Sequence, residues 1–216
     1  MERSCLLPFI EDKGAINAYK QLRTRLLKRV RDNGWTSIMV TGTLPNDGKT
    51  TTAINLAIAA SQDVRQSVLL VDLDLERPSI ADFLGLERVP GLSDYLGGSA
   101  SIGEVLYNTE IDRLMVLPNF DSIQSAELTT SPKMLGMLSH IQQLDPNLLI
   151  IFDVSPILSS DSVLAFGPYL DALLLVISEG HTSRVLLQRA SQMIEDMPRV
   201  GTVLNRSSES TAGGYY

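Results

Sequence analysis

The chain has 216 residues, 44% of them hydrophobic and 20% charged, and its formal net charge is −7. This length and composition suit one compact domain, and they exclude the disordered, collagen-like and small disulfide-stapled classes. The acidic balance also disfavours nucleic acid as a partner. One cysteine, Cys5, and two histidines, His140 and His181, exclude an internal disulfide and a Cys/His zinc cluster. Because the apolar runs are too short for a membrane span and no signal peptide is recognisable, we expect a cytoplasmic protein.

In chain order, an amphipathic helix over about residues 15–31 comes first, because its apolar residues recur at helical spacing. Strand-length apolar runs then alternate with helical patterns. The expected strands are 37–41, 68–72, 114–118, 148–153, 172–178 and 202–205, and the expected helices are 50–61, 132–144 and 183–197. This alternation predicts an α/β fold, a doubly wound and mostly parallel sheet with helices on both faces. We expect one domain over residues 1–205 and a flexible, tyrosine-bearing tail over 206–216.

The strongest chemical signal is a glycine-containing loop between the first strand and the next helix, TGTLPNDGKTTT. Backbone amides of such a loop, at a helix N-terminus, can surround the phosphates of ATP. Lys49 would reach the β and γ phosphates, and the Thr50 hydroxyl would bind Mg²⁺. The candidate nucleotide-binding residues of the loop are Thr43, Pro45, Asn46, Asp47, Gly48, Lys49, Thr50 and Thr51. The pattern predicts a P-loop NTPase fold, and a turn that only caps a helix is the alternative.

The loop departs from the general pattern GxxxxGK[ST] in one respect, since Thr43 stands at the first glycine position and Gly42 precedes it. Leu44 occupies the place where partition and division-site ATPases carry a lysine. That difference counts against the dimer-dependent ATP switch of those proteins.

Carboxylates follow two further strands. Asp72 and Asp74 follow the apolar part of the segment SVLLVDLDLERP, and alternation places both side chains on one face of an extended segment. Asp153 ends the apolar run LLIIFD. Paired carboxylates can hold Mg²⁺, and one of them can orient or deprotonate an attacking hydroxyl. The alternative is a polar strand end whose acids cap a helix.

These motifs resemble those of the bacterial tyrosine kinases (BY-kinases), the autokinases of capsule and exopolysaccharide synthesis. The loop is similar to their xPGEGKS version at Pro45, with Asn46 in place of glycine, and Asn tolerates positive φ better than most residues. The segment ending in Asp72 and Asp74 resembles their LLVDxDxRxP motif, although Glu76 interrupts it.

The resemblance implies a role for each site residue in ATP-dependent phosphorylation of tyrosine. Lys49 and Asp72 are the catalytic candidates, with Asp72 as the base, while Thr50, Asp74 and Asp153 surround the magnesium ion. At the end of the last strand, Asn205 and Arg206 would contact the nucleotide, although Asn is also an ordinary turn residue. The last residues, Tyr215 and Tyr216, would be the phosphoacceptors of a neighbouring copy, or part of an incidental tail.

The resemblance also implies partners. One is a membrane-bound activator of the polysaccharide chain-length (co-polymerase) type, which would hold the chain at the inner face of the plasma membrane. The other is further copies of the chain in a homo-oligomer. The family's ring-forming motif ExxRxxR falls on Asn17, Lys20 and Arg23, so only its last arginine is kept. The first helix carries basic residues without acidic ones from Lys20 to Arg31, which suits an anionic membrane surface, an acidic partner or a solvated charged face.

Two other functions are compatible with the sequence. One is a switch ATPase of the partition or division-site type that hydrolyses ATP and phosphorylates no tyrosine. The other is a nucleotide-binding regulator that has lost turnover. An assay that follows both phosphotyrosine and free phosphate separates the three functions.

Overall fold

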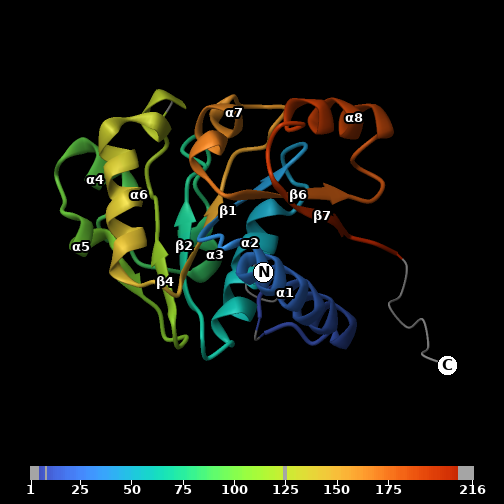
Figure 1. Ribbon diagram of the computed structural model, residues 1–216, viewed down its shortest axis with the longest axis horizontal. Helices are drawn as coiled ribbons and strands as arrows, with labels where there is room; N and C mark the ends of the chain where they lie inside the picture. Colours follow the sequence, from blue (N-terminus) through green and yellow to red (C-terminus); the bar gives the residue numbers. More distant parts are fainter. Residues whose placement is uncertain (1–4, 8, 124–125, 209–216) are drawn as a thin grey trace.

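The structure, a computed structural model, describes residues 5–7, 9–123 and 126–208. Its centre is a seven-stranded sheet in the order β3-β4-β2-β5-β1-β6-β7 (Figure 1). All neighbouring strands are parallel except β3, which pairs antiparallel with β4. The strands are β1 (Ser37–Gly42), β2 (Ser67–Asp72), β3 (Tyr107–Asn108), β4 (Leu114–Leu117), β5 (Leu148–Asp153), β6 (Ala172–Ser178) and β7 (Arg199–Asn205).

Helices connect these strands and cover both faces of the sheet (Figure 1). They are α1 (Lys13–Asn33), α2 (Lys49–Ser61), α3 (Ile80–Leu84), α4 (Leu92–Gly97), α5 (Ile102–Val105), α6 (Pro132–Leu144), α7 (Ser162–Phe166) and α8 (Arg184–Met193), with short 3₁₀ turns η2 (Ala126–Thr130) and η3 (Gly167–Tyr169). The predicted doubly wound α/β fold is therefore confirmed.

The first helix begins and ends where its sequence provides caps. Asp12 accepts a hydrogen bond from the Gly14 amide at 2.7 Å, which satisfies one of the free amides at the helix start. Gly34 ends the helix with φ 68°, a conformation that costs glycine little. The buried positions Leu26, Leu27 and Val30 lie on one side and pack against the core.

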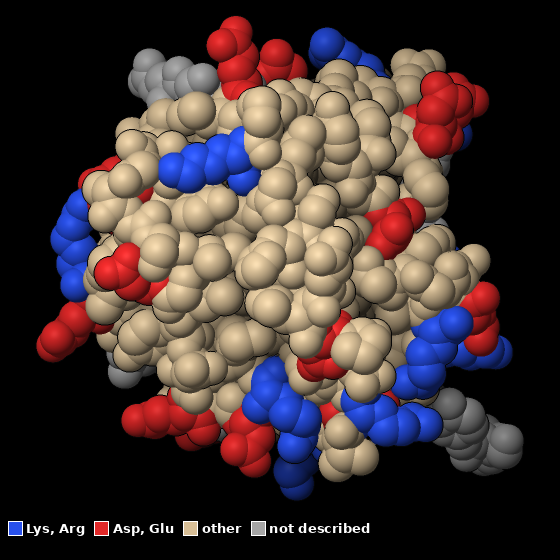
Figure 2. Space-filling view, turned by 60° about the vertical axis from the view of Figure 1, so that its left-hand side comes forward, with Lys and Arg blue, Asp and Glu red and all other residues tan. Residues whose placement is uncertain are grey.

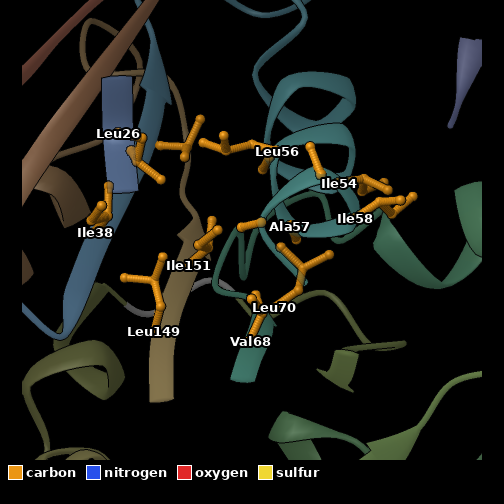
Figure 3. Close-up of a cluster of buried hydrophobic side chains, with 14 of the residues drawn as sticks. Leu26, Ile38, Ile54, Leu56, Ala57, Ile58, Val68, Leu70, Leu149 and Ile151 are labelled. Carbon is orange, nitrogen blue, oxygen red and sulfur yellow. The ribbon is translucent and has the colours of Figure 1, made fainter. Parts of the chain in front are cut away.

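The core has two parts, one on each side of the sheet, because side chains alternate along each strand. One part joins α1 and α2 to inward-facing residues of the strands. Figure 3 shows Ala57 of α2 beside Ile151 and above Leu70, and Leu26 of α1 above Ile38. The other part joins α4 to α8 to the remaining strand residues. Helix α2 is buried along almost its whole length, so the loop before it is held at a fixed place above the sheet.

Three differences from the expected elements have simple causes. The two-residue strand β3 and the short helices α3, α4 and α5 are too brief for periodicity to reveal. Helix α8 ends at Met193 because Ile194 leaves the helical conformation, with φ −112° and ψ 21°. Strand β7 begins at Arg199, earlier than expected, because its pairing with β6 starts there, opposite Leu173.

Charged side chains are dispersed on the face shown in Figure 2. The centre of this face is free of Lys, Arg, Asp and Glu, and both signs lie around its rim. None of the helices in the described part of the chain has the length and apolar character needed to cross a bilayer.

Candidate functional site

The candidate site lies at the edge of the sheet where the central parallel strands end. β1 leads into the loop at residues 43–48, and β2 and β5 end side by side in Asp72 and Asp153, which are register partners. Ligands of open α/β sheets bind at this edge, since helix N-termini and strand ends meet there. The topology therefore brings the loop and both acidic strand ends together, as expected.

The loop has the backbone conformation that its unusual residues suggest. Asn46 has φ 69° and Gly48 has φ 91°, both in the left-handed region. A Cβ atom at Gly42 would lie 3.2 Å from Cβ of Asp47, so the displaced glycine gives the loop room to fold back on itself. The Asp47 carboxylate accepts hydrogen bonds from the backbone amides of Thr43 and Leu44, each at 2.9 Å.

The last strand supports this loop from behind. Asn205, at the end of β7, donates a hydrogen bond from Nδ2 to the carbonyl oxygen of Asp47 at 2.9 Å. A Cβ atom at Gly48 would displace the Asn205 amide and would be strained at φ 91°, so glycine is favoured there. Thr43 is fully buried and turned towards Asp47. Thr43, Asp47 and Asn205 thus shape the loop from within and behind.

Lys49, the first residue of α2, lies among the acids. Its Nζ atom is 2.8 Å from Oδ2 of Asp74 and 3.4 Å from Oδ1 of Asp153. The Thr50 hydroxyl donates to Oδ2 of Asp153 at 2.6 Å. Burial lowers the pKa of Lys49, but the negative charges of Asp153 and Asp74 raise it by more. The pKa of Lys49 therefore lies above its ordinary value. A charged lysine therefore stands at the start of the helix, where phosphate groups bind best.

Asp72 is fully buried, as are Asp47 and Asp153. Its Oδ2 atom accepts hydrogen bonds from the amides of Ser79 and Ile80, each at 2.9 Å. Within the described residues, its Oδ1 atom has no hydrogen-bond partner. Burial, reinforced by the nearby charge of Asp153, raises the pKa of Asp72 from 3.8 to about 8. This side chain is thus a proton-binding group with an unused oxygen beside Lys49 and Asp153.

A cavity of about 510 Å³ opens above these residues. Of the predicted nucleotide or metal residues, those that line it are Pro45, Asn46, Gly48, Lys49, Thr50, Thr51, Asp74 and Arg206. Those that do not line it are Thr43, Asp47, Asp72, Asp153 and Asn205. The structure thus separates the predicted residues into those that line the cavity and those that do not.

The donors beside Lys49 suit Mg²⁺. They are hydroxyl and carboxylate oxygens from Thr50, Asp74 and Asp153, together with the unpartnered oxygen of Asp72. In the described part of the chain, no three acidic, histidine or cysteine side chains converge as a metal cage of their own. Magnesium at nucleotide sites needs only one or two carboxylates, because phosphates and water supply the other ligands.

Several residues near the site are not among the predicted site residues, although Arg77 lies in the motif that follows β2. Ser155 donates from Oγ to Oδ1 of Asp74 at 2.7 Å, and its hydroxyl thus holds a predicted metal ligand. Arg77 and Phe83 line the cavity from the segment after β2. His181 contacts Asp47 through Nδ1 at 2.8 Å. These contacts join residues distant in the chain, and local patterns do not report them.

Comparison with known families agrees with this geometry. Residues 38–213 match the family model described as the CobQ/CobB/MinD/ParA nucleotide binding domain. The chain belongs to this family. The predicted P-loop NTPase fold is confirmed. The resemblance of the chain to bacterial tyrosine kinases is confirmed by similar proteins that carry this name and by a similar solved structure.

Tyrosine-protein kinase YwqD of Bacillus subtilis is 28% identical over 202 residues, covering 92% of this chain and 84% of the relative. Tyrosine-protein kinase wzc of Salmonella typhimurium is 31% identical over 167 residues, covering 75% of this chain but only 22% of the relative. The kinase domain of Escherichia coli tyrosine kinase ETK has a TM-score of 0.80 and 25% identity, covering 93% of this chain and 80% of that structure. This nucleotide-binding domain therefore spans most of YwqD and about a fifth of wzc.

Proposed function

We propose that this chain is a magnesium-dependent protein-tyrosine kinase that transfers the γ-phosphoryl group of ATP to tyrosine and acts in exopolysaccharide or capsule synthesis. The observation that carries the proposal is Lys49 between Asp74 and Asp153, at the base of a cavity lined by the phosphate-binding loop. The kinase names of relatives such as YwqD and wzc support the choice of tyrosine as acceptor.

Each group then has a definite task in the transfer. Lys49 neutralises charge on the β and γ phosphates, and the amides of residues 46–50 bind their oxygens. Thr50, Asp74 and Asp153 hold Mg²⁺, which when bound supplies further charge neutralisation. The proposed contacts of the nucleoside are Arg206, which lines the cavity, and Asn205, which holds the loop through the Asp47 carbonyl.

Asp72 acts on the acceptor. The bond between the γ phosphorus and its bridging oxygen breaks, and a bond to the phenolic oxygen forms, while the phenolic proton passes to Oδ1 of Asp72. This oxygen has no competing hydrogen-bond partner among the described residues. A base whose pKa is raised to about 8 lies closer to the operating pH than an ordinary carboxylate, which favours proton transfer.

The acceptors in the proposal are Tyr215 and Tyr216 of a neighbouring copy; both lie outside the described residues. A membrane-bound activator of the polysaccharide co-polymerase type is the proposed partner, at the cytoplasmic side of the membrane. Helix α1 exposes Lys20, Arg25 and Lys28, which suits contact with an acidic surface of that partner or of its membrane.

The test is incubation of the purified chain with Mg²⁺ and ATP labelled at the γ phosphate, with measurement of phosphotyrosine and free phosphate. Label on tyrosine, lost in Lys49→Met and in the double variant Tyr215→Phe/Tyr216→Phe, is the expected result. Lys133→Met, which changes an exposed lysine on α6, is the matched control and should retain labelling. Free phosphate alone would replace the kinase by a switch ATPase, and nucleotide binding without either product would leave a regulator.

A further inference from the structure

Asp47 is a fully buried acid inside a loop whose proposed ligand is itself an anion. Its Oδ2 atom shapes the loop by accepting hydrogen bonds from the amides of Thr43 and Leu44 and from the Thr43 hydroxyl. A buried negative charge beside a polyphosphate is costly unless donors offset it. The second carboxylate oxygen, Oδ1, must therefore also be satisfied.

The donors for Oδ1 come from the segment between β6 and α8, 134 positions later in the chain. His181 Nδ1 lies 2.8 Å from Oδ1 and the Thr182 hydroxyl lies 3.2 Å from it. The Thr182 hydroxyl also accepts from the Ser178 amide at 3.1 Å and contacts the Thr43 hydroxyl at 3.0 Å. In Figure 1 this segment leads from β6 into α8, beside the end of β1.

We propose that His181 and Thr182 are positioning residues for the phosphate-binding loop, acting through the carboxylate of Asp47. The proposal rests on the proposed nucleotide-binding function. Neither residue lines the cavity, so their effect on the nucleotide passes through the loop. His181 must present an N–H at Nδ1, because an ionised carboxylate only accepts hydrogen bonds.

The ionised state of Asp47 agrees with this arrangement. Burial raises its pKa, but hydrogen bonds from Thr43, His181, Leu44 and Thr182 outweigh burial and hold the pKa below its ordinary value. Since the Asp47 carbonyl also accepts from Asn205, this one residue ties the loop to the ends of both β6 and β7. Without His181, Oδ1 would keep only the longer bond from Thr182, and the carboxylate that orients the Thr43 and Leu44 amides would be less firmly fixed.

The experiment is calorimetric titration of the full chain with MgATP for wild type, His181→Ala, His181→Asn and Thr182→Val. We expect His181→Ala to weaken binding about tenfold, the usual scale for loss of a hydrogen bond to a charged group. His181→Asn should recover most of the affinity, because its side-chain amide can donate from nearly the same place. Thr182→Val should weaken binding less, since its bond is longer. His140→Ala, at an exposed position on α6, is the matched control and should bind as wild type.

A double-mutant cycle shows whether the effect passes through Asp47. In an Asp47→Asn background, His181→Ala should cause little further loss. Thermal unfolding without nucleotide is measured in parallel. If the role of His181 were merely structural, His181→Ala would lower the melting temperature and His181→Asn would not restore it. The proposal is overturned if His181→Ala binds within about twofold of wild type, or if its full loss persists beside Asp47→Asn. Failure of wild type to bind MgATP would instead overturn the proposed function, and this inference with it.

Discussion

The buried carboxyl of Asp72 should make the folded chain less stable as the pH rises. Its pKa is about 8 in the folded protein and 3.8 in the reference state, so the folded chain keeps a proton that the unfolded chain releases between these values. The free energy of unfolding therefore falls with rising pH across this window, and the full penalty is present above about pH 8. The interval of about 4 pH units, at about 1.4 kcal/mol each, sets an upper bound of about 6 kcal/mol.

Asp72→Asn isolates this effect, because the amide oxygen can still accept from Ser79 and Ile80 while the side chain stays neutral. Since relaxation and water entry reduce such penalties, we expect the variant to be more stable than wild type by about 1–4 kcal/mol at pH 8. The advantage should shrink steadily towards pH 4.

The assay is urea unfolding of wild type and variant from pH 4 to pH 8, with chelator and without nucleotide. Asp112→Asn, at an exposed position, is the control and should show no such trend. A stability difference that is independent of pH, or an Asp72→Asn variant less stable than wild type at pH 8, would refute the reasoning. The same variant should lose tyrosine phosphorylation, so stability and activity would change in opposite directions.

Other predictions concern the loop and the core. Gly48→Ala places a Cβ at a residue with φ 91°, so it should lower the free energy of unfolding by at least about 1 kcal/mol and abolish MgATP binding. Gly136→Ala lies in open space on α6, so it should raise the free energy of unfolding by up to about 1 kcal/mol in thermal unfolding. Leu26 is fully buried in α1, so Leu26→Ala should lower the free energy of unfolding in urea by about 2–5 kcal/mol. Lys28 is exposed on the same helix, so Lys28→Ala should lower it by less than about 0.5 kcal/mol. Equal losses in the two variants would contradict the packing described. Asp47→Asn should have a free energy of unfolding about 1–3 kcal/mol lower than wild type at pH 7. This difference should narrow as the pH falls below 3.8, because a carboxyl with a lowered pKa loses its stabilising contribution when it is protonated. A difference that stays constant in acid would contradict this prediction.

Much of the fold follows from local patterns. The strand runs ending at Asp72 and Asp153 are short, apolar and bounded by polar residues, and each forms a buried strand of the sheet. Apolar spacing predicts the helix over 15–31, and its caps extend it to Lys13–Asn33. Patterns of this kind reflect burial on one face, which a sequence records directly.

The site was predictable where one motif holds several of its residues together. The loop from Pro45 to Thr51 lines the cavity largely as expected, and Asn46 adopts the positive φ that its side chain tolerates. The sequence does not distinguish the residues that line the cavity from those that do not, because this depends on the packing of the finished fold. The contacts of Asp47 with His181 and of Asp74 with Ser155 join segments 134 and 81 positions apart, so they depend on the finished fold.

The most direct test of the central claim is a crystal structure of the chain with Mg²⁺ and a non-hydrolysable ATP analogue. The account predicts a triphosphate bound by the loop around Lys49, with a cation coordinated by Thr50 and facing Asp74 and Asp153. A nucleotide bound elsewhere, or a cation coordinated by none of these three residues, would contradict it.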